Sequence, residues 1–207
     1  MRNTLRKIAI ATGVASAALV LGTTQAMAAP ATTWTVSPDP APFTAVSTNT
    51  VLEAGGIPMT CPEAGAGGTG FSATGNPGHV ADIESAYFGT SAAPCTSILG
   101  PVAPVTSTSP PWRIQAVDYD DATGVTTGYI DNISAEVTVL SCTFTVSGEV
   151  NATYANDTDV LSVEAGGDHV LNVSDATAGC AGLIEDGMNP SFTGDYAVDG
   201  VDSIVGS

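Results

Sequence analysis

Basic residues are scarce in this sequence, and most of them stand at its N-terminus. The 207 residues include four Lys and Arg against 21 Asp and Glu. Three of the four bases are Arg2, Arg6 and Lys7, so the chain beyond residue 28 has no lysine, keeps Arg113 alone against 21 acids, and carries a net charge of −20. A surface of that sign repels phosphate backbones and anionic lipid headgroups. We therefore expect no nucleic acid or anionic membrane as a partner, whereas a cationic or cell-envelope partner, or a role of the charge in solubility alone, is compatible with it.

Motifs that would mark an enzyme are also missing. No G-x-S-x-G nucleophile motif occurs, and the only histidines, His79 and His169, stand beside glycines in segments expected to be loops. Adjacent strand residues point to opposite faces, so Asp168 and His169 cannot form the orienting pair of a catalytic triad. A hydrolase that uses carboxylates stays an alternative, with Trp34 and Trp112 as sugar platforms, but no carboxylate pair is marked out. The sequence favours a protein without catalytic residues or cofactors.

One glycine pattern matches a nucleotide-binding motif by its letters only. Residues 65–70 read G-A-G-G-T-G, which fits G-x-G-x-x-G. A dinucleotide fingerprint must follow a buried strand and open a helix, whereas these glycines follow Cys61-Pro62-Glu63 and run into "FSATGNPG". We therefore expect a flexible glycine-rich loop over residues 65–78.

Metal-binding patterns are equally incomplete. Asp118, Asp120 and Asp121 are the candidates for a calcium site, since closely spaced carboxylates in a turn supply hard oxygen ligands. The EF-hand pattern fails, because its glycine would fall on Thr123 and its final Glu on Tyr129. No C-x-x-C spacing occurs for zinc. We expect an acidic hairpin tip at these aspartates and no metal.

The N-terminus has the pattern of a secretory signal peptide. Residues 1–7 are basic, residues 8–21 are uncharged and apolar, and Ala26-Met27-Ala28 has small residues at the two positions that a signal peptidase reads. We expect cleavage after Ala28 and a secreted, extracellular product. The expected organisation is a signal peptide over 1–28 and a single exported domain over 29–207, with a proline-rich connector between two weakly related halves at about 100–111.

Four cysteines remain in the exported chain, which predicts two disulfides in an oxidising compartment. Three pairings are open. The spacing favours Cys61 with Cys95 and Cys142 with Cys180, because both loops then have similar lengths. The segments that begin at the second cysteine of each pair are alike, "CTSILG" and "CAGLIE", which indicates an internal duplication. On the chain-entropy estimate each bridge stabilises the fold by about 3 to 4 kcal/mol.

The rest of the exported chain is typical of β structure. Helix-favouring residues are few, whereas Thr, Val, Ser, Gly and Pro abound. Residues 113–130 alternate apolar and polar side chains about a turn, which predicts a hairpin, and further alternating runs follow to the C-terminus. Turn clusters such as "SGE", "NDTD" and "DGMNP" separate them. We predict an all-β fold, a single antiparallel β-sandwich or barrel-like domain with two disulfides, and one helical turn at residues 181–186.

Three segments carry a resemblance: "TTWTV", "PPWRIQAVDYDDATGVTTGYI" and "CAGLIEDGMNPSFTGDYAV". They resemble small secreted β-rich proteins of actinobacteria of unassigned function, over most of the exported chain. The resemblance implies a β fold, secretion and an actinobacterial origin, and it supplies no catalytic residue. The acidic, doubly disulfide-bonded apoproteins of the neocarzinostatin type are also similar, although their disulfide loops are shorter, and they imply that such a scaffold can hold an apolar ligand.

The functional hypothesis is accordingly an exported, non-catalytic module that binds or supports other components outside the cell or in its envelope. Its ligand is not identified by the sequence. The alternatives are a secreted hydrolase that uses carboxylates and a carrier of a small apolar ligand.

Overall fold

The computed structural model describes residues 31–207, and within this range the chain is all-β apart from one short 3-10 helix. This confirms the predicted fold class. The predicted signal peptide, residues 1–28, and its cleavage site after Ala28 lie outside the described residues. Within the described range no helix is long and apolar enough to cross a membrane.

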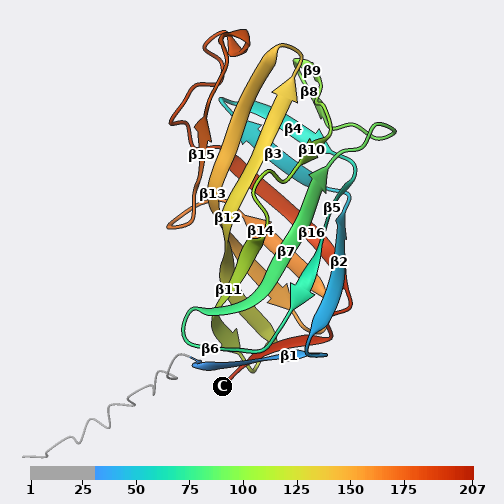
Figure 1. The fold of residues 1–207 in the computed structure, drawn as a ribbon, viewed down its shortest axis with the longest axis vertical. Coiled ribbons are helices and arrows are strands. Elements are labelled where there is room, and N and C mark those ends of the chain that lie inside the picture. Colours follow the sequence, from blue (N-terminus) through green and yellow to red (C-terminus); the bar gives the residue numbers. More distant parts are fainter. Residues whose placement is uncertain (1–30) are drawn as a thin grey trace, which may run out of the picture.

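Eight antiparallel strands close into a barrel (Figure 1). In order around the barrel they are β2 (Ala41–Ser47), β5 (Ala64–Gly70), β7 (Gly78–Phe88), β11 (Trp112–Asp120), β12 (Val125–Val139), β13 (Cys142–Ala155), β14 (Val160–Glu164) and β16 (Ser191–Asp199). Strand β16 closes the barrel because it pairs with β14 on one side and with β2 on the other. Of the two predicted architectures, sandwich and barrel-like domain, the structure is a barrel.

Alternating side chains place the core inside this barrel. On β2 the side chains of Ala41, Phe43 and Ala45 are buried, whereas Pro42 and Thr44 between them are exposed. This two-residue period is the property of a strand with one face on a core and the other in water. An eight-stranded barrel has an interior just wide enough for side chains or one small ligand.

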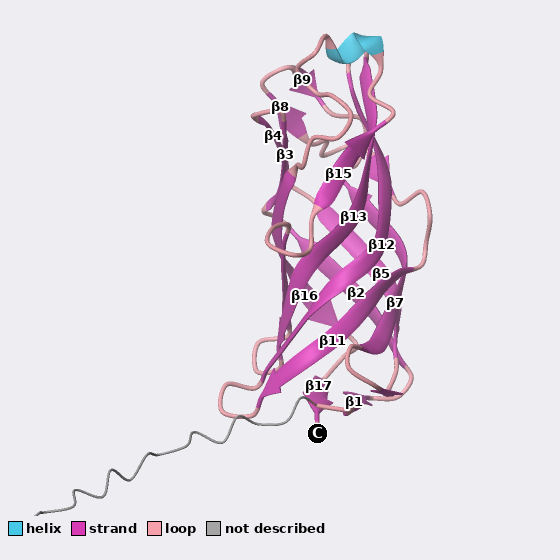
Figure 2. Cartoon of the chain, turned by 90° about the vertical axis from the view of Figure 1, so that its left-hand side faces the viewer, coloured by secondary structure: helices cyan, strands magenta, loops and turns pink. Residues whose placement is uncertain are grey.

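A small sheet covers one end of the barrel. Strand β1 (Thr33–Ser37) lies between β17 (Ser203–Gly206) and β6 (Ala73–Thr74), across the lower end in Figures 1 and 2. The side chain of Trp34 on β1 is fully buried, and its Nε1 donates a hydrogen bond to the carbonyl oxygen of Gly75 at 3.0 Å. This end is therefore closed by a large, fully paired aromatic side chain.

The other end is built from short strands and loops. The remaining elements are β3 (Thr50–Ala54), β4 (Ile57–Cys61), β8 (Thr96–Ser97), β9 (Gly100–Pro101), β10 (Val105–Thr106), β15 (Leu171–Ser174) and the 3-10 helix η1 (Ala178–Cys180). Strands β3, β4, β8 and β9 extend the sheet from β16. The proline-rich residues 100–111 lie between β7 and β12, because β10 pairs with β7 while Val102 and Ser107 form bridges to β12.

The predicted helical turn at residues 181–186 is wrong. The one short helix is η1, three residues earlier in the chain. Ala181, Gly182 and Gly187 all have positive φ values, of 52°, 74° and 86°. A right-handed helix needs negative φ, so Ala181 and Gly182 end the helix at Cys180.

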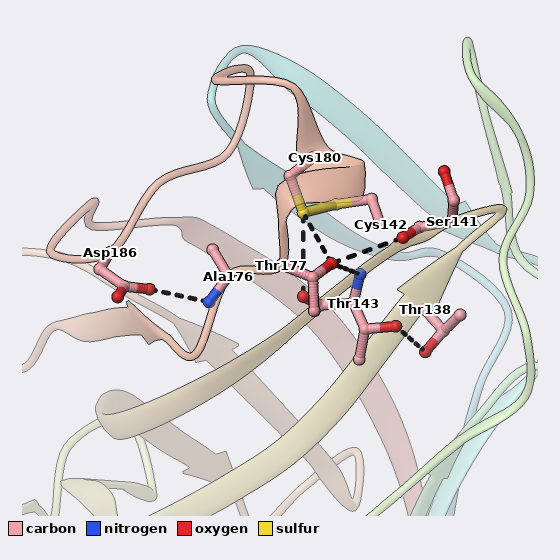
Figure 3. Close-up of a disulfide and its surroundings, with 8 residues drawn as sticks. All are labelled: Thr138, Ser141, Cys142, Thr143, Ala176, Thr177, Cys180 and Asp186. Carbon is pink, nitrogen blue, oxygen red and sulfur yellow. Dashed lines mark hydrogen bonds between the residues drawn. A yellow bond between two sulfur atoms is a disulfide. The ribbon is translucent and has the colours of Figure 1, made fainter.

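Both predicted disulfides are present, Cys61–Cys95 and Cys142–Cys180. The first joins β4 to the loop before β8. The second joins the start of β13 to η1, and Figure 3 shows the hydrogen bonds around it. There the backbone N–H of Thr143 donates to Thr177 Oγ1 at 3.0 Å, and that of Ala176 donates to Asp186 Oδ1 at 2.8 Å.

The expected glycine-rich loop over residues 65–78 is instead largely strand, since β5 forms part of the barrel wall. The glycines are needed because neighbouring groups approach the backbone closely. A Cβ on Gly65 would lie 2.6 Å from Cε1 of Tyr87, and one on Gly68 would lie 2.0 Å from the carbonyl oxygen of Asp82. The glycines therefore serve packing within an antiparallel sheet, and the nucleotide-binding context is absent here.

This packing gives a prediction with an internal control. Gly68→Ala should lower the free energy of unfolding by at least about 2 kcal/mol, because its Cβ would clash with a backbone atom that cannot move aside cheaply. Gly67→Ala, one residue away, should change it by less than about 1 kcal/mol, because its Cβ would meet Ser85 Oγ at an ordinary 3.5 Å. Urea unfolding of both variants measures the difference. Equal stability of the two variants would show that β5 does not lie as described.

Candidate ligand-binding cavity

The barrel contains an apolar cavity of about 100 Å³. All eight barrel strands contribute to its wall, with Phe43 on β2, Ile130 on β12 and Val150 on β13 among the lining residues. A second cavity of about 40 Å³ lies toward the end that β1 and β17 cover. Phe43 and Leu161 line both cavities and thus stand between them.

The larger cavity exists because small side chains occupy several inward positions. Ala45, Ala66, Ala86 and Ala135 all line it. Ala66 and Ala86 are directly paired across β5 and β7, so two methyl groups face the interior where longer side chains would meet. Protein interiors are normally packed with few voids larger than a water molecule. A space of this size in a barrel core is therefore a candidate binding site.

Two hydroxyl groups at the wall of the cavity are paired with each other. Thr50 Oγ1 lies 3.3 Å from the hydroxyl oxygen of Tyr196 and 3.0 Å from Ser47 Oγ. Burial raises the pKa of the Tyr196 hydroxyl to about 12, against a smaller opposing effect of its hydrogen bond with Thr50. Tyr196 is therefore neutral at any physiological pH, and it brings no charge to the cavity.

Trp112 is the third polar contributor to the wall, and its indole N–H is unpaired. The side chain lines the cavity from the start of β11 and is 6% exposed. Its Nε1 is buried and has no hydrogen-bond partner, the one such side-chain atom within residues 31–207. Buried polar groups are nearly always paired, so this nitrogen calls for an explanation.

The histidines lie outside the cavity. His79 stands in β7, where a loop was expected, and its Nε2 is 2.9 Å from Asp82 Oδ1. His169 lies in the turn after β14, with its Nδ1 2.7 Å from Glu149 Oε2 and its ring stacked on Tyr129 at a centroid distance of 4.2 Å. None of these residues lines the cavity. The two histidine–carboxylate pairs are therefore surface interactions away from the enclosed space.

Of the three aspartates considered for calcium, Asp118 and Asp120 lie at the end of β11 and Asp121 lies in the turn that leads to β12. Asp120 accepts hydrogen bonds from Thr123 Oγ1 at 2.8 Å and from the backbone N–H of Ala122 at 2.9 Å. These hydrogen bonds, that of Thr123 first, lower the pKa of the Asp120 carboxyl. In the described part of the chain, no three His, Cys, Asp or Glu side chains come together where they could hold a metal. The structure thus gives Asp120 a structural role in closing the hairpin, while Asp118 and Asp121 are exposed beside it.

The position of this cavity could not be predicted from the sequence. Alternation identified the inward positions, but alanine is common in cores and does not by itself indicate a void. Trp112 was considered as a sugar platform, whereas it is buried in the barrel wall. The unpaired nitrogen depends on what surrounds it, which no local pattern reveals.

Comparisons with known proteins give one match. A family model described as alkane oxidation protein activator PraA/PraB-like matches residues 5–180. No curated protein and no solved structure matches the chain. The matched residues run through β1 and the following strands to the second cysteine of the Cys142–Cys180 bond, so they contain both disulfides and most of the cavity wall.

Proposed function

The chain belongs to the PraA/PraB-like family of alkane oxidation protein activators, and on this premise we propose that it is an exported, non-catalytic barrel that binds a short linear hydrocarbon chain. The observation that supports this most is the character of the cavity. Apart from Tyr196, which is neutral, none of its lining residues titrates. Carboxylates and histidines, which a hydrolase would need beside its substrate, lie elsewhere.

The size of the cavity sets the length of chain that it holds. A cavity of about 150 Å³ in another protein binds benzene. The space of about 100 Å³ therefore accommodates about four or five carbon atoms, either a whole small molecule or one end of a longer one. Burial of a methylene group contributes about 0.8 kcal/mol, so a five-carbon chain gains about 4 kcal/mol and binds with a Kd on the order of 1 mM.

A role in activating alkane oxidation is consistent with a barrel that works outside the cytoplasm. The basic and apolar leader and the two disulfides support export to an oxidising compartment. The acidic exterior keeps the barrel soluble there. By holding an apolar chain out of water, the barrel raises the amount of that chain carried in the aqueous medium, and it thereby assists an oxidation that other proteins catalyse.

Titration of the protein with n-pentane tests this proposal. We expect saturable stabilisation against heat, because a ligand that binds only the folded state raises its stability. In a sample with ¹⁵N-labelled tryptophan, the indole resonance of Trp112 should shift, since that side chain lines the cavity. The resonance of Trp34, at the covered end of the barrel, serves as the control and should stay in place. An unchanged melting temperature with no shift at Trp112 would contradict the proposal.

A further inference from the structure

We infer that the natural ligand of the cavity carries a neutral carbonyl oxygen, as in an aldehyde or a methyl ketone, which accepts a hydrogen bond from Nε1 of Trp112. This inference rests on the proposed function, because it specifies the chemical class of the chain that the same cavity holds. A carbonyl compound stands between an alkane and a carboxylic acid in oxidation level. The barrel would then hold a partly oxidised chain.

The unpaired indole nitrogen is the observation behind this inference. An indole N–H is a donor only, and a buried donor without an acceptor destabilises the folded state. The other tryptophan shows the usual solution, since Trp34 Nε1 donates to the carbonyl oxygen of Gly75. Trp112 Nε1 has no such protein acceptor, although its side chain is equally part of the core. An acceptor on a bound ligand would satisfy it once the side chains around the nitrogen shift enough to admit that acceptor, because the nitrogen is fully buried in the free protein.

A water molecule is a poorer partner for this nitrogen. An ordered buried water needs about two to four polar partners. The other polar side chains at the wall are Thr50 and Tyr196, whose hydroxyls are already paired with each other, and the remaining lining side chains are apolar. A water at Trp112 would therefore leave most of its own hydrogen bonds unmade. A ligand with an apolar body and one acceptor suits both the nitrogen and the wall.

The donors, acceptors and charges at the cavity wall also indicate which functional group of the ligand carries the oxygen. An alcohol would bring a hydroxyl proton, and the side-chain acceptors at the wall are the hydroxyls of Thr50 and Tyr196, which already share a hydrogen bond with each other. A carboxylate would bring a buried charge, and no basic residue lines the cavity. The neighbouring Arg113 donates from Nε to Asp131 Oδ1 at 2.8 Å, and its side chain is about half exposed. A carbonyl oxygen is neutral and only accepts, so it matches a single N–H donor.

The test compares ligands of equal length on the wild type and on Trp112→Phe, which removes the donor and keeps an aromatic ring. Four probes serve: n-pentane, pentan-2-one, pentan-1-ol and pentanoate. We expect Trp112→Phe to weaken pentan-2-one binding about tenfold, because the carbonyl is then buried unpaired, and to leave n-pentane binding within about twofold. Trp34→Phe, the same substitution at the covered end of the barrel and outside the cavity, is the matched control, and it should change neither affinity. Pentan-1-ol should bind the wild type more weakly than pentan-2-one, and pentanoate should not bind measurably.

A second readout uses the wild type alone, in case Trp112→Phe fails to fold. The indole proton of Trp112 should move downfield with pentan-2-one and not with n-pentane, as a newly formed hydrogen bond requires. If n-pentane and pentan-2-one shift this proton alike, or Trp112→Phe affects both affinities equally, the inference is overturned while hydrocarbon binding stands. If no probe binds, the proposed function fails and the inference fails with it. Pentanoate that binds as well as pentan-2-one would also overturn the inference.

Discussion

Replacing Cys61 and Cys95 together by alanine is expected to lower the free energy of unfolding by about 4 kcal/mol and to weaken n-pentane binding. The first effect comes from the unfolded chain, in which the bond spans 34 residues and restricts the accessible conformations. The weaker n-pentane binding is expected because both cysteines line the cavity. The bond ties β4 to the loop before β8, and without it this part of the wall would open more often.

Replacing Cys142 and Cys180 by alanine is the matched control. Its loop is nearly the same length, 38 residues, so the expected loss of stability is again about 4 kcal/mol. Neither cysteine lines the cavity, and the hydrogen bonds of Thr177 and Asp186 shown in Figure 3 still hold the segment beside β13. Ligand affinity should therefore change in the first variant only. Urea unfolding and n-pentane titration of both variants measure this, and equal loss of affinity in the two would contradict the position assigned to the Cys61–Cys95 bond.

The second large effect is expected from Ala135→Leu, which should strongly weaken n-pentane binding and stabilise the protein. Ala135 lies on β12 and lines the cavity, so three additional carbon atoms would occupy space that the ligand needs. We expect n-pentane affinity to fall at least tenfold. Filling an apolar void also buries more surface, and the stability of the free protein should rise by up to about 2 kcal/mol. Loss of function would thus accompany a gain in stability.

Ala197→Leu supplies the control for this substitution. Ala197 is exposed on β16, next to Tyr196, which lines the cavity. The same change in side chain therefore adds its carbon atoms to the outer face of the barrel, where n-pentane affinity should stay within about twofold of the wild type. Thermal unfolding and titration of both variants are the measurements. Full n-pentane affinity in a stabilised Ala135→Leu protein would show that the ligand binds somewhere else.

The β character of this fold could be predicted because strand periodicity is a local property. The hairpin from Arg113 to Ile130 was expected from alternation, and its strands β11 and β12 pair Arg113 with Asp131 and Ile114 with Ile130. The disulfide pairing was correctly favoured from loop lengths. Barrel closure was beyond the sequence, because it depends on one strand, β16, pairing with both β14 and β2 far away in the chain.

The errors have physical causes as well. Residues 65–70 were expected to be a loop because glycine has low strand propensity, yet β5 needs glycines where Tyr87 and Asp82 approach its backbone. His79 was placed in a loop for the same reason, since it follows Gly78 at the start of β7. An apolar-ligand carrier was only an alternative, and no cavity could be located from the sequence, because a void is the absence of atoms among residues that are distant in sequence. The apolar character of the cavity is apparent only in the folded structure, in which Trp112 and the inward alanines line the same space.

Crystals of residues 29–207 soaked in 1-iodobutane offer the most direct test of an apolar ligand inside the barrel. The iodine scatters anomalously, so its position can be found without assumptions about the ligand. We expect an anomalous peak in the cavity between Phe43, Ala135 and Trp112, and none there in Ala135→Leu crystals. Iodine sites confined to the outer surface of the wild-type barrel would contradict the account.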